Sequence, residues 1–138
     1  MDHQPFQAEA KRLCVLKFGS SVLRVESDYA GVALEVYRHV RDGEKVVAVV
    51  SALLGETDSL LNQGARVGGE DPALLARVAR VGELHSAALM ALALSRLGIR
   101  ACTLDPHEMG LVAEGDPLDA NLTGLDAEVV LADRKSVV

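Results

Sequence analysis

Three continuous apolar runs mark this chain, and each has the length of a buried strand. They cover Leu13–Phe18, Lys45–Ser51 and Ile99–Leu104. A strand that is buried on both faces, as in a parallel sheet, has a continuous apolar sequence rather than an alternating one. The segments between the runs are long enough for crossover helices. The pattern therefore predicts an α/β fold of three layers, αβα, around a mainly parallel sheet.

Helical spacing of apolar residues fills the segments between these runs. One helix is expected to start at Ser27 or Asp28 and to end at Gly43. Another is expected to start at Asp71–Pro72, and Gly82 is expected to interrupt it, so that Glu83 opens a separate helix. A short helix capped by Thr57 or Asp58 is also expected, followed by a loop at Gly64, Gly68 and Gly69. Near the end of the chain, a short strand is expected over Gly110–Ala113, and a further element is expected to begin at Ala127.

Composition narrows the class of protein. A chain of 138 residues, 49% hydrophobic and 25% charged, suits one folded domain. This domain is expected over residues 1–138, and residues 1–12 are expected to form a polar, disordered start. The net charge is -6 and aromatic residues make up 3%, so we expect no nucleic-acid partner. The start carries no secretory signal and no apolar stretch is long enough to cross a bilayer, which predicts a cytoplasmic protein with no membrane partner.

The two cysteines do not form a recognisable metal or redox motif. Cys14 and Cys102 each lie in an apolar run, far apart and without CxxC or metal-ligand spacing. Such cysteines are typical of reduced thiols in a core. No metal ligands are predicted from the sequence.

Three polar clusters follow predicted strands or stand at predicted helix starts. They are Lys17–Ser21, Ser51–Asp58 and Gly82–Ser86. In an open α/β sheet such positions meet at one edge, where ligands bind and where helix N-termini favour anions. A lysine followed by a turn of small residues favours phosphate, although an ordinary strand end with a solvated lysine has the same pattern. Neither a P-loop nor a GxGxxG fingerprint is present.

The same three clusters resemble the aspartate kinases of the amino-acid-kinase superfamily. Lys17-Phe18-Gly19-Ser20-Ser21-Val22 is similar to the KFGGTSV signature of that family, with Ser20 in place of the second glycine. The segment Val50–Leu61 resembles their VSAMxGxTDxLL motif, and Gly82–Ser86 resembles their GExxS motif. His85 occupies a variable position of that motif and is treated as neutral. The resemblance covers about residues 13–105.

This resemblance implies an activity and a set of roles. Aspartate kinases use ATP and Mg²⁺ to phosphorylate the β-carboxylate of L-aspartate, the first step toward lysine, threonine and methionine. By resemblance, Lys17 is the catalytic residue, and Lys17, Gly19, Ser20 and Ser21 bind the phosphate of the nucleotide. Ser51, Thr57 and Glu83 would bind the substrate, Glu83 through its α-ammonium group. The plain alternatives are turn and cap chemistry for Ser51 and Thr57, and a helix-dipole contact for Glu83.

The family pattern continues beyond the point that corresponds to Val138, through a glycine-rich segment that binds ATP. The chain therefore resembles the amino-terminal, substrate-side half of the catalytic domain. It is expected to be inactive alone and to associate with itself or with a chain that supplies the missing half. Two alternatives stay open, namely a non-catalytic kinase-like remnant or binding module, and another amino-acid or carbamate kinase of the superfamily.

Overall fold

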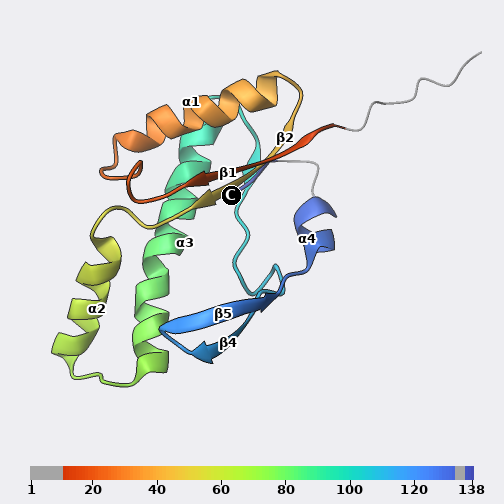
Figure 1. Cartoon of the computed structure of the whole chain (residues 1–138). Helices are drawn as coiled ribbons and strands as arrows, with labels where there is room; N and C mark the ends of the chain where they lie inside the picture. Colours follow the sequence, from red (N-terminus) through yellow and green to blue (C-terminus); the bar gives the residue numbers. More distant parts are fainter. Residues whose placement is uncertain (1–10, 133–135) are drawn as a thin grey trace, which may run out of the picture.

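The structure is a computed structural model that describes residues 11–132 and 136–138. The predicted disordered start lies outside the described residues except for Lys11 and Arg12. The elements follow one another as β1 (Leu13–Phe18), α1 (Asp28–Arg41), β2 (Lys45–Val50), α2 (Glu56–Val67), α3 (Pro72–Arg96), β3 (Ala101–Cys102), β4 (Val112–Asp116), β5 (Asp119–Gly124), α4 (Ala127–Ala132) and β6 (Ser136–Val137) (Figure 1). The predicted α/β class is confirmed.

The main sheet has the order β1-β2-β6-β3, and all its neighbouring strands are parallel. β1 and β2 pair over their whole length, from Leu13 opposite Lys45 to Phe18 opposite Val50. These two strands match the predicted runs to within one residue. The predicted third strand is much longer than β3, because the partner of β3 in the ladder, β6, has only two residues.

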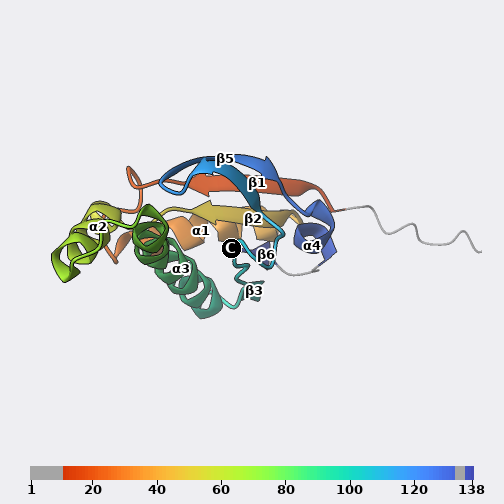
Figure 2. The same ribbon diagram turned by 90° about the horizontal axis from the view of Figure 1, so that it is seen from below.

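Two helices cover one face of this sheet, as Figure 2 shows for α1 and α3. The side chains that point toward them are buried at Phe18, Val46 and Ala48, and they pack with Val36 of α1 and Met90 of α3. The opposite side of β1 and β2, here called the open face, carries the alternate residues. These are Leu13, Val15, Lys17, Lys45, Val47 and Val49.

α1 begins where the sequence predicts, at Asp28, whereas α2 begins earlier than predicted. Ser27 occupies the N-cap of α1 without a side-chain hydrogen bond. Asp28 instead accepts from the backbone N–H groups of Arg24 and Val25 at 2.9 and 3.0 Å, which holds the pKa of its carboxyl below the usual value. α2 begins after Gly55, whose φ of 80° suits glycine. The predicted caps Thr57 and Asp58 therefore lie inside the first turn of α2, and that prediction is wrong.

The predicted break at Gly82 is also wrong, because α3 runs unbroken over 25 residues. Asp71 caps it as expected, with its carboxylate accepting from the backbone N–H of Ala73 at 2.9 Å. Gly82 is buried, and a Cβ built on it would lie 2.9 Å from the Cβ of Ala52. The glycine permits a close approach of the helix to the loop after β2. Gly64 likewise lies within α2, whereas Gly68 and Gly69 lie outside helix.

The C-terminal third of the chain forms a hairpin and a short helix. The expected short strand is β4, which pairs antiparallel with β5, and the element expected at Ala127 is α4. The Nζ of Lys45 donates to the carbonyl of Leu131 at 2.7 Å, which attaches α4 to the open face. Within residues 11–132 and 136–138, no helix combines the length and the apolar character needed to cross a membrane.

Candidate functional site

The loops that follow β1 and β2 lie side by side at the carboxyl edge of the sheet. The backbone N–H of Ser51 donates to the carbonyl of Phe18 at 3.1 Å, and that of Leu54 donates to the carbonyl of Leu23 at 3.0 Å. Inside the first loop, the Gly19 carbonyl accepts from the N–H groups of Val22 and Leu23, both at 3.0 Å. The first two predicted clusters therefore share one edge.

The third cluster packs against the second, although not in the way that the sequence predicts. Gly82 contacts the loop at Ala52, and the Nδ1 of His85 lies 3.1 Å from Oε1 of Glu56. Glu83 stands about three turns into α3 rather than at a helix start. A helix-dipole contact therefore does not explain Glu83, since the dipole acts only within the first turn.

The predicted phosphate loop is open to solvent. Lys17 is exposed on the open face and makes no side-chain hydrogen bond or ion pair with the described residues. The backbone N–H groups of Ser20 and Ser21 have no acceptor in the same part of the chain. A Cβ built on Gly19 would meet nothing within 4 Å, and the φ of Gly19 is not positive. The fold itself thus does not require glycine at this position.

The predicted substrate-binding residues lie in the neighbouring segments. Ser51 is half-buried and donates its hydroxyl to the carbonyl of Ala52 at 3.0 Å. Thr57 is half-buried in the first turn of α2, and Glu83 is exposed on α3. Across the described ranges, no hydrogen bond or ion pair joins Lys17, Ser51, Thr57 and Glu83 to one another. The structure brings together the segments that carry these residues, not their side chains.

Glu56 lies in this region, and the sequence alone predicts no role for it. Its Oε2 accepts from the backbone N–H of Leu53 at 3.3 Å while Oε1 faces His85. It lines a shallow depression together with residues 24–27 and 53–55 and His85. The sequence feature that could have identified Glu56 is its position directly before Thr57 in the second motif.

Ser86, the last residue of the third motif, has a structural contact. It is fully buried, and its hydroxyl lies 2.7 Å from the hydroxyl of Tyr29 on α1. Burial raises the pKa of the Tyr29 hydroxyl, so this group stays protonated at neutral pH. The contact joins α3 to α1.

Comparison with known proteins shows which family the chain resembles. The amino acid kinase family matches residues 12–136. An aspartokinase of Helicobacter pylori is 34% identical over 117 residues, which cover 84% of this chain and 29% of that protein. The solved aspartate kinase of Synechocystis aligns with a TM-score of 0.63 and 29% identity over 67% of this chain and 16% of that one.

A third comparison bears on the fold alone. The carbamate kinase of Giardia aligns with a TM-score of 0.66 over 94% of this chain and 59% of that one, at 13% identity. The chain spans less than a third of the length of the curated aspartokinase that it matches. From the family match over nearly all of its length, the chain belongs to the amino acid kinase family.

Proposed function

We propose that the chain is the amino-terminal, substrate-side part of an aspartate kinase, which phosphorylates the β-carboxylate of L-aspartate with ATP. The observation that carries the proposal is the meeting of three motif segments, distant in sequence, at one corner of the fold. The loops after β1 and β2 are joined through Ser51 and Phe18, and α3 packs on the second loop through Gly82. The likeness to aspartokinases in sequence supports aspartate as the substrate.

The roles proposed for the phosphate loop follow from its chemistry. ATP with Mg²⁺ supplies the transferring phosphoryl group, and catalysis of such a transfer consists mainly of positioning and charge neutralisation. The solvent-exposed ammonium of Lys17 would lie against that group. The unengaged N–H groups at Ser20 and Ser21 and the open space at Gly19 fit a close approach of phosphate oxygens.

The substrate would be held by the other two segments. Ser51 and Thr57 have hydroxyls suited to hydrogen bonds with carboxylate oxygens. Glu83 would face the α-ammonium of aspartate as its counter-charge. The carbamate kinase likeness shows fold alone at its low identity, so it does not favour a second substrate.

Further parts of the proposal concern the whole protein. Because the chain spans 29% of the aspartokinase that it matches, we propose that turnover needs residues beyond these 138. The chain alone is then expected to release no ADP and to bind aspartate weakly. With this activity we also propose that the protein acts in lysine and threonine biosynthesis and lies in the cytoplasm.

The test is Lys17→Ala in a protein that joins these residues to the remaining catalytic residues. Aspartate-dependent ADP release should fall to background, and Lys17→Arg should not restore it, because a planar guanidinium replaces a compact ammonium. The far-ultraviolet circular dichroism should not change, since the exposed Lys17 side chain makes no hydrogen bond or ion pair with the described residues. Activity within a few fold of the parent would remove Lys17 from the proposed site. Turnover of carbamate but not of aspartate would refute the proposed substrate.

A further inference from the structure

A cysteine, a histidine and a glutamate meet at the end of the sheet opposite the candidate site. Cys14 is the second residue of β1, His39 lies in the last turn of α1, and Glu44 immediately precedes β2. The thiol sulfur, a ring nitrogen and a carboxylate oxygen of these residues all lie within 4.8 Å of one another. All three residues are half-buried. Three different segments therefore contribute one potential metal ligand each.

We propose that Cys14, His39 and Glu44 bind a zinc ion. Thiolate, imidazole and carboxylate are the three ligand types that zinc takes in proteins, at about 2.0–2.3 Å from the metal. Ligand atoms around a tetrahedral zinc then lie about 3.3–3.8 Å apart. His39 Nδ1 and Glu44 Oε2 are now 2.5 Å apart in a hydrogen bond, which the ion would replace with two metal bonds. Rearrangement of about 1 Å completes the site and leaves a fourth position for water.

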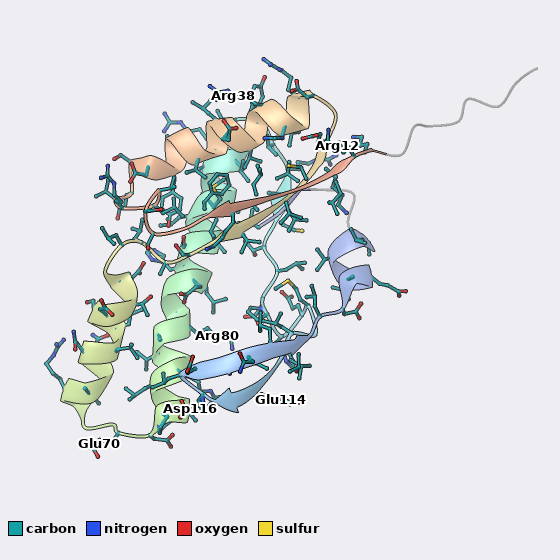
Figure 3. All side chains as sticks on the ribbon, in the orientation of Figure 1. Arg12, Arg38, Glu70, Arg80, Glu114 and Asp116 are labelled. Carbon is teal, nitrogen blue, oxygen red and sulfur yellow. The ribbon has the colours of Figure 1, made fainter. Side chains whose placement is uncertain are left out.

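The surrounding charges fit a divalent cation. Glu35 Oε1 lies 3.7 Å from Nε2 of His39, so it can orient the ring with Nδ1 toward the site, as carboxylates do behind zinc-bound histidines. A thiolate at Cys14 and the carboxylate of Glu44 together balance the charge of the ion, and binding releases the thiol proton. The Arg12 guanidinium lies 3.6 Å from the other oxygen of Glu44, but its side chain is 85% exposed and free to turn into solvent. Figure 3 shows Arg12 at the start of β1.

The position of this site gives it a structural role. Along the extended chain at 3.3 Å per residue, Cys14 lies about 16 Å from Gly19. It lies about 10 Å from Lys17, whose side chain is on the opposite face of β1. Zinc at Cys14 is therefore too far from the phosphate loop to take part in phosphoryl transfer. It would instead tie together the start of β1, the end of α1 and the start of β2. The proposal is independent of the proposed kinase activity.

The experiment is a titration of the metal-free 138-residue chain with Zn²⁺, and with Co²⁺ as a spectroscopic substitute. We expect one equivalent to bind, a cobalt–thiolate charge-transfer band and a rise in melting temperature with zinc. Cys14→Ser should abolish the band and weaken zinc binding by more than the about 10- to 100-fold that loss of an orienting partner costs. Glu35→Gln should keep the stoichiometry and weaken binding about 10- to 100-fold, as expected for a residue that orients a ligand.

Matched controls use the other cysteine and a histidine outside the cluster. Cys102→Ser and His107→Gln should leave the affinity and the band unchanged. If Cys14→Ser does not fold, alkylation of the parent chain decides, because zinc should protect Cys14 and leave the rate at Cys102 unchanged. A cobalt complex without the thiolate band, or alkylation of Cys14 that saturating zinc does not slow, would overturn the proposal.

Discussion

The fold does not require glycine at position 19, so any need for glycine there would come from a bound ligand. A methyl group at this position meets no atom within 4 Å, and the backbone does not need a positive φ. Gly19→Ala should therefore change the free energy of unfolding by less than about 1 kcal/mol. If phosphate oxygens approach the backbone here, the same methyl group occupies their place. We expect aspartate-dependent ADP release in the longer protein to fall by at least about tenfold, or about 1.4 kcal/mol.

Urea unfolding and the kinetic assay together make this test decisive. Parent-like stability with parent-like activity would show that no ligand approaches Gly19. A large loss of stability would instead assign the glycine to the fold.

The buried pair of hydroxyls at Tyr29 and Ser86 gives a second prediction at the same scale. Ser86→Ala leaves the Tyr29 hydroxyl buried without its partner, which costs about 1–3 kcal/mol of unfolding free energy. Tyr29→Phe should cost less, because a helical serine can turn its hydroxyl to the carbonyl four residues earlier. Urea unfolding of both single variants and of the double variant gives the coupling energy. Strict additivity would show that the hydroxyls do not interact.

Gly82 joins two elements, and its substitution tests how closely they pack. Alanine there would gain up to about 1 kcal/mol of helix propensity. Its Cβ would stand 2.9 Å from the Cβ of Ala52 and 3.3 Å from Cδ1 of Leu60, so α3 must move away from the loop and from α2. Overpacking of this kind costs about 1–3 kcal/mol. We expect a net loss of about 1 kcal/mol by urea unfolding.

Gly31 offers the matched control, since it is a glycine within α1 whose added Cβ meets nothing within 4 Å. Gly31→Ala should stabilise the chain by up to about 1 kcal/mol through helix propensity alone. Equal stabilisation by both substitutions would mean that α3 does not press on the loop after β2.

The same contact explains which elements the sequence could predict. Periodicity located β1, β2 and α1 closely, because their burial depends on local pattern. A glycine within a helical pattern has two opposite meanings, a break or a close contact, and only the tertiary neighbour at Ala52 decides between them. The predicted N-caps of α2 were wrong for a similar reason. Gly55, whose φ is positive, occupies the N-cap position that was predicted for Thr57 or Asp58.

The candidate site depends on how elements distant in sequence pack together. The sequence placed the Lys17 and Ser51 segments at one edge correctly, because parallel strands end on the same side. It could not predict the His85–Glu56 contact or the hydroxyl pair at Ser86, which depend on the rotation of α3 against its neighbours. The same holds for the Cys14 cluster, whose three residues are brought together by the turn between α1 and β2.

The open face exposes apolar side chains next to an edge of the sheet. Val15 is 62% exposed and Val49 47% exposed on adjacent strands, and β1 is an edge of the sheet in the part of the chain that the structure describes. Exposed valines on two neighbouring strands, beside an unpaired edge, favour association. The 138-residue chain should therefore sediment as a dimer or larger species at micromolar concentration. High salt should not dissociate it, because the contact is apolar rather than ionic.

Substitutions on the open face identify the surface involved. Val15→Thr combined with Val49→Thr keeps the β-branched shape and adds two hydroxyls whose desolvation opposes association. This double variant should shift toward monomer in sedimentation velocity. Val67→Thr on α2, at a valine that is 85% exposed, should sediment like the parent. A parent chain that stays monomeric up to high micromolar concentration would show that the open face is stable in water. If only Val67→Thr shifted the sedimentation toward monomer, the association surface would lie on α2 instead.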